Sequence, residues 1–149
     1  MQLDSFLLAD AAAALEGKLY VHGGGITRIN SPRFPLVQQL AFVLRFLAVD
    51  QDDLTSAHTI GVSLTAPDHE FLVPEQGLRI QPPAEYLNVV EGETRAINVA
   101  LTVNGLVFPA AGMYSAQAYL DGEVVRDLPL PVVLIVPPDP EEEPPADDA

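Results

Sequence analysis

The sequence predicts an all-β fold, an antiparallel β-sandwich of about seven to nine strands in a single domain. Several segments alternate apolar and polar residues, which is the pattern of strands with one buried face. Turn-forming residues separate these segments at intervals of about 8–12 residues, as in sandwiches and barrels built from short strands. Hydrophobic residues make up 48% of the 149 residues, which is enough for a core without disulfides.

The first strand candidate is QLDSFLLA, and three later segments alternate cleanly: HTIGVSLTAPD, TRAINVALTV and LPLPVVLIV. In the last segment Pro129 and Pro131 share the face opposite the leucines. Because proline donates no hydrogen bond to a neighbouring strand, these two residues predict a strand that lies at an edge or begins irregularly. The residues expected on the apolar faces are His58, Ile60, Val62 and Leu64, then Ile97, Val99, Leu101 and Val103, and finally Leu128, Leu130, Val132, Leu134 and Val136.

Two segments have features of a helix, and the second is ambiguous between helix and strand. DAAAALEG is expected to form one or two helical turns, with Asp10 as the N-cap and Gly17 as the stop. LVQQLAFVLRFLAVD also fits a helical face, but its aromatic and β-branched residues favour a buried strand that an acidic turn closes. EFLVPEQGLRIQPPAEYL contains three prolines, which predict edge or irregular pieces.

The hairpin signal is strongest in MYSAQAYLDGEVV, because Asp121 and Gly122 tolerate the positive φ of a tight turn. The chain then ends in PPDPEEEPPADDA. This tail has no large apolar residue, so residues 137–149 are expected to be disordered, and residues 1–136 to form the β domain. The tail is interpreted as a solubilising segment, or else as an acidic peptide that docks on a basic partner.

The formal net charge is −14, from 21 acidic and 7 basic residues. Such a surface repels phosphate backbones and anionic lipids, so neither nucleic acid nor membrane is expected as a partner. No run reaches the roughly 18 apolar residues of a membrane span. The absence of cysteine excludes disulfides and thiolate sites and suits a reducing compartment, so the protein is expected in the cytoplasm.

The segment ALTVNGLVFPAAGMYSAQA, residues 100–118, resembles the passage between the E and F strands of immunoglobulin-like domains. Gly112 and Tyr114 occupy the positions that open the F strand there. The resemblance implies a tyrosine corner, in which the Tyr114 hydroxyl bonds to a backbone group a few residues upstream. Ala116 stands in place of the half-cystine and the chain has no tryptophan, so the resemblance is architectural and other Greek-key sandwiches remain possible.

The chain as a whole resembles a family of small bacterial proteins classed only as a domain of unknown function. The resemblance is carried by LLAD, GKLYVHGGGITRI, FPLVQQLAFVLRF and FPAAGMYSAQAYLDGEVVRDLPLPV. It covers most of residues 1–136 and implies a β-sandwich, but no activity, substrate or site.

The letters HGGG, from His22 to Gly25, match the oxyanion-hole motif of many lipases and esterases. The nearest nucleophile elbow is GVSLT, where Ser63 is followed by Thr65 instead of the second glycine. Asp68 and His69 are adjacent and cannot both align on that serine. No catalytic residue is therefore expected, and a small hydrolase that uses Ser63 and His22 ranks third among the hypotheses.

A phosphate-binding loop is also disfavoured, because Arg28 stands where the third glycine of GxGxxG belongs and no Walker lysine follows. Gly23, Gly24 and Gly25 are instead expected to bend or bulge a strand, or to let another backbone approach closely.

The three histidines, His22, His58 and His69, have no metal-ligand spacing, and no cofactor is expected. Loop carboxylates can bind calcium at the end of a sandwich, as in C2-type domains. The weak metal candidates are therefore Asp50, Asp52 and Asp53, with oxygens added from Asp68, Glu70 or Asp121.

The leading hypothesis is a non-enzymatic β-sandwich module that acts through protein contacts, as an adaptor or a subunit of an assembly. The alternative is a calcium- or ligand-binding module that uses the turn at residues 50–53.

Overall fold

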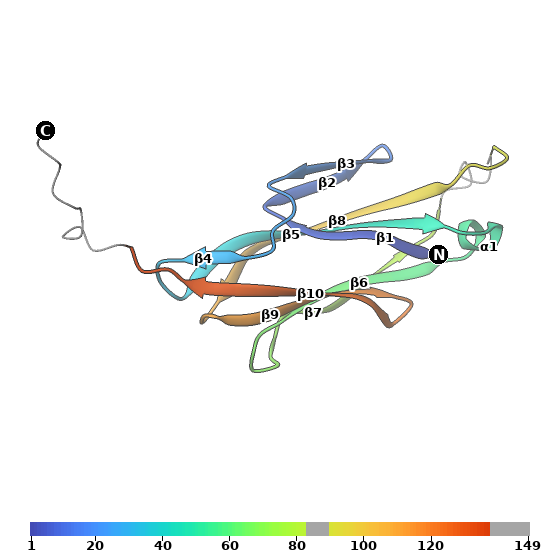
Figure 1. The fold of residues 1–149 in the computed structure, drawn as a ribbon. Coiled ribbons are helices and arrows are strands. Elements are labelled where there is room, and N and C mark those ends of the chain that lie inside the picture. The colour runs from blue at the N-terminus through green and yellow to red at the C-terminus, as the bar shows by residue number, and fades with distance from the viewer. Residues whose placement is uncertain (83–89, 138–149) are drawn as a thin grey trace, which may run out of the picture.

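Ten strands and one short helix make up the part of the chain that this computed structural model describes, residues 1–82 and 90–137 (Figure 1). The all-β prediction is confirmed, although the strand count exceeds the expected seven to nine. The elements are β1 (Gln2–Ala9), β2 (Ala11–Leu15), β3 (Lys18–His22), β4 (Ile29–Ser31), β5 (Leu36–Ala48), α1 (Gln51–Thr55), β6 (His58–Thr65), β7 (Phe71–Ile80), β8 (Arg95–Phe108), β9 (Gly112–Leu120) and β10 (Glu123–Leu134).

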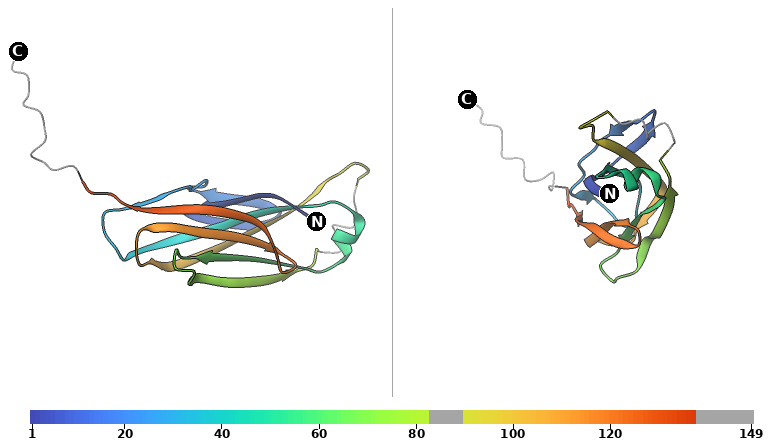
Figure 2. Two further views of the ribbon diagram at one scale, coloured as in Figure 1. Left: turned by 60° about the horizontal axis from the view of Figure 1, so that its bottom comes forward. Right: turned by 90° about the vertical axis from the view of Figure 1, so that its right-hand side faces the viewer.

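The strands form three sheets. Three strands pair in the order β1-β5-β8, and five pair in the order β4-β10-β9-β6-β7. β2 and β3 form a separate hairpin that lies on the outer side of the three-stranded sheet (Figure 1). Viewed end-on, the two larger sheets curl around one interior (Figure 2). All neighbours are antiparallel except β4 and β10.

The core lies between the two larger sheets, where every second residue of a strand points inward. β6 follows the predicted alternation, with Ile60, Val62 and Leu64 buried, and its partner β9 adds Ala116 and Ala118. The opposing wall comes from β1 and β5, through Phe6, Leu8, Leu40, Phe42, Leu44 and Phe46. The predicted apolar face of β8 packs against this core, but its side chains are only half-buried.

The ambiguous segment at residues 36–49 forms a strand, β5, as the sequence favoured. β1 pairs with one side of it and β8 with the other. Both of its faces are covered, because Phe42 points into the core while Val43 lies beneath the β2–β3 hairpin. Burial on two faces explains why its apolar residues run on continuously instead of alternating.

The helical prediction for DAAAALEG is wrong, because Ala11–Leu15 is strand β2. Alanine and leucine favour helix, but one or two isolated turns do not offset the cost of helix nucleation. Pairing with β3 satisfies the backbone instead, and Ala12 packs on Ala9, Ala41 and Val43. The expected stop, Gly17, takes a φ of 72° in the turn of this hairpin.

The edge prediction is confirmed for β7 but not for β10, which lies between β4 and β9 in the five-stranded sheet. β10 pairs with β9 from Glu123 to Val132, but β4 joins its other side only from Val132 onward. Pro129 and Pro131 therefore lie where β10 has a single neighbour. β7 ends the five-stranded sheet as predicted for its segment. The rest of that segment, residues 83–89, and most of the predicted disordered tail, residues 138–149, lie outside the described residues.

Candidate functional site

The three glycines after β3 end a strand, whereas the sequence suggested that the strand would bend there and resume. β3 stops at His22, and the next strand, β4, belongs to another sheet. The predicted close approach of another backbone is present: the N–H groups of Gly25 and Ile26 both donate to the Leu8 carbonyl, at 2.9 and 3.0 Å.

Side chains at Gly23 and Gly24 would collide with neighbouring side chains, whereas Gly25 has open space around it. A Cβ at Gly23 would lie 2.0 Å from Oδ2 of Asp10, and a Cβ at Gly24 would lie 2.8 Å from Cγ1 of Val21. Gly23 and Gly25 also take φ values of 60° and 80°. The glycines thus let the chain cross from the hairpin, past the end of β1, toward β4.

His22 and Ser63 are not brought together. Ser63 is buried on β6, where its Oγ lies 3.1 Å from the Tyr119 hydroxyl. That hydroxyl donates onward to Gln117 at 2.9 Å. His22 ends β3, in the hairpin that lies on the outer side of the other sheet. Within residues 1–82 and 90–137 the described hydrogen bonds therefore contain no serine–histidine pair.

The expected acidic turn at residues 50–53 is instead the start of helix α1. Asp50 accepts a hydrogen bond from the Asp53 N–H at 3.0 Å, and Asp53 accepts one from the Asp50 N–H at 3.3 Å. This reciprocal pair is a capping box, which satisfies backbone donors at a helix start. The side chains of Asp50 and Asp53, two of the three calcium candidates, are thus engaged in helix capping, while that of Asp52 is exposed.

Asp53 also joins a group of charges at the α1 end of the molecule. It accepts hydrogen bonds from the N-terminal ammonium at 2.6 Å and from the Val49 N–H at 2.7 Å. Burial raises the pKa of Asp53, but these bonds and the one from Asp50 outweigh burial, so the net pKa is lowered. Next to it, the buried Nε2 of His58 lies 3.8 Å from Asp53 Oδ1.

The other ring nitrogen of His58 lies 3.0 Å from Asp121 Oδ2. This hydrogen bond, together with one from the Thr59 N–H at 2.9 Å, lowers the pKa of Asp121. Asp121 and Gly122 form the two-residue turn between β9 and β10, with φ values of 50° and 84°. The hairpin prediction is confirmed, and the turn is tied to β6 through its carboxylate.

The remaining candidates for a cation lie in the turn between β6 and β7. The Asp68 carboxylate accepts a hydrogen bond from the Glu70 N–H at 3.1 Å, and the His69 N–H donates to the Ala66 carbonyl at 2.9 Å. Across the residues that the structure describes, no three histidine or acidic side chains gather as a metal would require.

Tyr114 lies at the opposite end of the core from α1, and its ring is buried edge-on against Phe108. Its hydroxyl donates to the Ala110 carbonyl at 2.7 Å, four residues upstream, as the sequence suggested. Gly112 has a φ of 153° and lies against Pro67, where a Cβ would be 2.5 Å from the proline ring.

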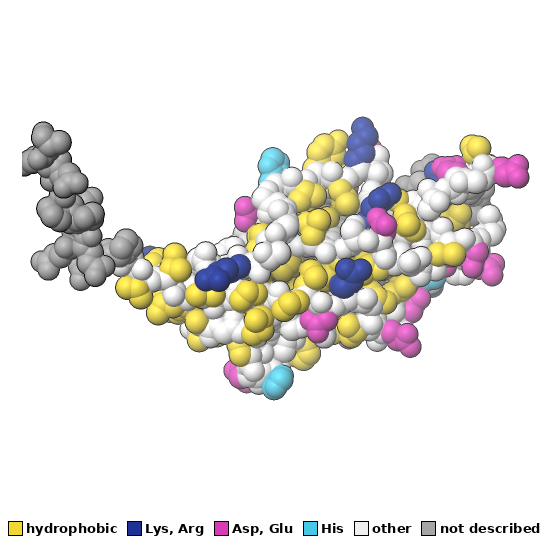
Figure 3. Space-filling model, in the orientation of Figure 1, with side chains coloured by type: hydrophobic (Ala, Val, Ile, Leu, Met, Phe, Trp, Pro, Cys, Tyr) yellow, Lys and Arg dark blue, Asp and Glu magenta, His cyan; other side chains and the backbone are white. Residues whose placement is uncertain are grey.

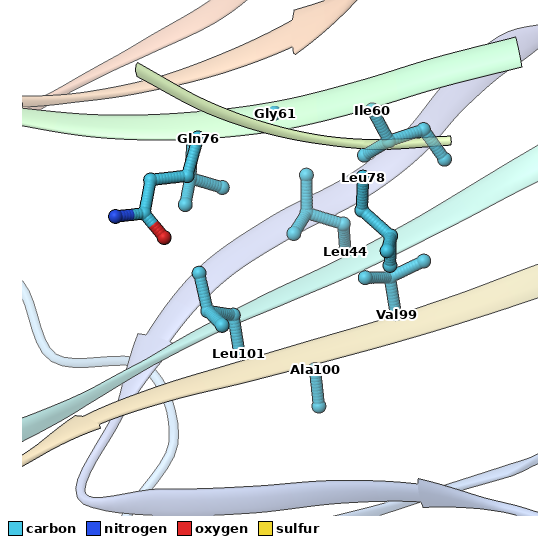
Figure 4. Close-up of a pocket in the computed structure, with 9 residues that line it drawn as sticks. Leu44, Ile60, Gly61, Gln76, Leu78, Val99, Ala100 and Leu101 are labelled. Carbon is cyan, nitrogen blue, oxygen red and sulfur yellow. The ribbon is translucent and has the colours of Figure 1, made fainter. Parts of the chain in front are cut away.

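An apolar opening lies between the free edges of the two larger sheets, where β7 faces β8 (Figure 4). We call this opening the β7–β8 seam. In Figure 4 the side chains of Leu78 and Val99 point toward each other from the two strands. Leu78 is 56% exposed although it is paired with the buried Ile60. The residues lining the hollow are Leu44, Ile60, Gly61, Val62, Gln76, Leu78, Val99, Ala100 and Leu101.

The hollow in the seam has a volume of about 60 Å³. Pockets for cofactors and drug-sized ligands measure roughly 300–1,000 Å³, so this one has room for a single small apolar side chain. A larger hollow of about 380 Å³ lies beside the loop after β4, but residues within 31–37 line it alone, whereas strands of both larger sheets line the seam beside the core. The seam is therefore the better candidate for a functional surface.

Sequence reasoning did not identify this seam. The prolines in the β7 segment indicated an edge, and the alternation in TRAINVALTV indicated a buried face, but nothing showed that the two strands would face one another. The available signal was Leu78, a large apolar residue between Gly77 and Arg79.

The family model of DUF6941, described as a family of unknown function, matches residues 4–133. The chain belongs to DUF6941.

The DUF6941 match extends from β1 into β10, so it includes both strands of the seam and the crossing at residues 23–25. No curated protein matches the chain. In the described residues, no helix is long and apolar enough to cross a membrane.

Proposed function

We propose that this DUF6941 member is a non-enzymatic protein-interaction module of the bacterial cytoplasm, an adaptor or a subunit of an assembly. The observation that carries the proposal is the apolar β7–β8 seam, which exposes Leu78 beside half-buried residues of β8. Apolar surface left open beside a core is typical of sites where proteins bind one another.

The charge of the chain supports a protein partner over nucleic acid, because a net charge of −14 repels phosphate groups. The cytoplasmic setting rests on the cysteine-free composition. The calcium alternative gains no support from the described residues, because Asp50 and Asp53 cap α1.

We extend the proposal to the finer fold: an immunoglobulin-like, Greek-key arrangement of the two larger sheets. The bond from Tyr114 to Ala110 supports it, since immunoglobulin-like domains carry such a corner before the F strand. The additional hairpin β2–β3 and the short β4 are departures from that plan.

Site-specific photo-crosslinking of the full chain in its native cell tests the interaction. A photo-reactive phenylalanine analogue replaces Leu78 in one variant and the half-exposed Tyr20, on the hairpin, in the control. The proposal expects a discrete crosslinked product from position 78 and none from position 20. Absence of any product from position 78, together with a monomer at micromolar concentration, would contradict it.

A further inference from the structure

We infer that the partner adds an extended strand to the free edge of β7 and places an apolar side chain in the β7–β8 seam. This inference rests on the proposed function and specifies its partner: a segment of a different protein that alternates apolar and polar residues and is flanked by lysine or arginine. Addition of a strand to an exposed sheet edge is a recurring mode of peptide recognition.

The other edges of the two larger sheets are interrupted only in part, since Glu123–Leu128 of β10 has no proline and β8 is a second free edge that faces β7. The feature that distinguishes β7 is the apolar hollow beside it. The free part of β10 carries Pro129 and Pro131, which donate no hydrogen bond to an added strand. β1 is the outer strand of its sheet, but the Leu8 carbonyl accepts from Gly25 and Ile26, which cross its end. β4 is only three residues long.

β7 is only partly protected as an edge. It has ten residues, from Phe71 to Ile80, and among the described residues it pairs only with β6. Pro74 removes one donor near its start, which leaves the stretch from Glu75 to Ile80 free of proline. The strand has no lysine, which is a common protection of sheet edges, but it carries two exposed charged residues, Glu75 and Arg79.

The geometry of the seam selects the side chains of the added strand. In a strand every second side chain points to the same face, at a rise of about 3.3 Å per residue. One inward residue would enter the 60 Å³ hollow between Leu78 and Val99, which suits a small branched aliphatic group. The next inward residue would lie over the half-buried apolar side chains of β8.

The negative charge at this end of the molecule favours a partner segment with basic residues. Asp50, Asp52 and Glu91 are exposed at the end of the molecule where β7 finishes and β8 begins, and they outnumber the exposed Arg79 of β7. Figure 3 shows acidic side chains gathered at this end. A second copy of the chain would bring a further charge of −14 to this edge, and that repulsion disfavours self-association. A segment with flanking lysine or arginine is attracted instead.

The test uses the full-length protein and a displayed library of nine-residue peptides. In the library, positions 2, 4, 6 and 8 are valine, isoleucine or leucine, and the other positions are threonine, serine, lysine or glutamate. We expect enrichment of peptides with lysine over glutamate. Affinity for the enriched peptide should fall at least tenfold in Leu78→Lys and stay unchanged in Val37→Lys, whose valine is 63% exposed on β5. Thermal melts confirm that both variants fold.

Hydrogen exchange then distinguishes strand addition from simple apolar contact. With the enriched peptide bound, amides of residues 75–80 should become protected, while the proline-blocked edge of β10 is unaffected. No enrichment, equal loss in both variants, or protection elsewhere would overturn the inference. A crosslink from position 78 without protection of β7 would overturn strand addition alone and leave the proposed interaction function standing.

Discussion

At the scale of single residues, polar side chains at the two ends of the core hold backbone groups that the strands leave unpaired. At one end the Tyr114 hydroxyl donates a hydrogen bond to the Ala110 carbonyl. At the other end the Asp53 carboxylate accepts hydrogen bonds from the Val49 and Asp50 N–H groups. The bond of Tyr114 was implied by the resemblance of residues 100–118 to immunoglobulin-like domains. The role of Asp53 was not predictable, because a capping box and a solvated acidic turn use the same residue types.

We expect Tyr114→Phe to lower the free energy of unfolding by about 1 kcal/mol, the usual net value of a hydrogen bond. The ring and its contact with Phe108 are kept, so the hydroxyl alone is removed. Urea unfolding measures the change, and Tyr20→Phe, at a half-exposed ring on the hairpin, is the control. Equal stability of the Tyr114 variant and the wild type would mean that the bond to Ala110 contributes nothing.

The lowered pKa of Asp53 predicts an acid-sensitive contribution to stability. A carboxyl group whose folded pKa lies below its unfolded value of 3.8 stabilises the fold above that value. This contribution is lost as the pH falls through the folded pKa. The drop in melting temperature from pH 7 to pH 3 should therefore be smaller in Asp53→Asn than in the wild type. The exposed neighbour variant Asp52→Asn should keep the wild-type drop, and a full drop in both variants refutes the assignment.

At the scale of elements, short turns decide which segments become strands. Ala11–Leu15 has helix-favouring composition, yet the turn at Glu16 and Gly17, with φ values of 50° and 72°, pairs it with β3. The turn at Asp121 and Gly122 joins β9 to β10 in the same way, and here its sequence signal was clear. The difference is that aspartate–glycine is specific for tight hairpins, whereas glutamate–glycine also ends helices.

Gly122 takes a φ of 84°, a region that costs most other residues roughly 1–2 kcal/mol. Gly122→Ala should therefore lower the free energy of unfolding by about 1 kcal/mol, while Gly122→Asn should be milder, because asparagine tolerates this region. Open space surrounds the position, so backbone strain is the single cause under test. If alanine and asparagine cost the same in urea unfolding, strain is not the cause.

At the scale of the whole molecule, two apolar clusters have different roles. The large one lies between the facing sheets and includes Val62, which is 2% exposed. The small one lies between the three-stranded sheet and the hairpin and includes Val43, which is 3% exposed. A valine-to-alanine substitution can therefore be made in each cluster at a residue that is almost equally buried.

Val62→Ala should lower global stability by on the order of 2 kcal/mol and speed hydrogen exchange in both larger sheets, because it leaves a cavity in the shared core. Val43→Ala should speed hydrogen exchange mainly in β2 and β3, since we expect this hairpin to unfold locally while the two larger sheets stay folded. Hydrogen exchange followed residue by residue tests both outcomes. Uniform acceleration in the Val43 variant would show that the hairpin unfolds only together with the core.

The sequence by itself determined the all-β class, the edge position of β7 and the β9–β10 turn, while the Tyr114 bond was implied by the resemblance to immunoglobulin-like domains. These features depend on local chemistry: the alternation of apolar residues, the missing N–H of proline, and the positive φ allowed at Asp121 and Gly122. Only the tertiary structure decided that β2 is a strand, that residues 23–25 cross the end of β1, and that Leu78 faces Val99. Those outcomes depend on which strands pack or pair with one another. The segments involved lie far apart along the chain, so no local sequence pattern predicts their contacts.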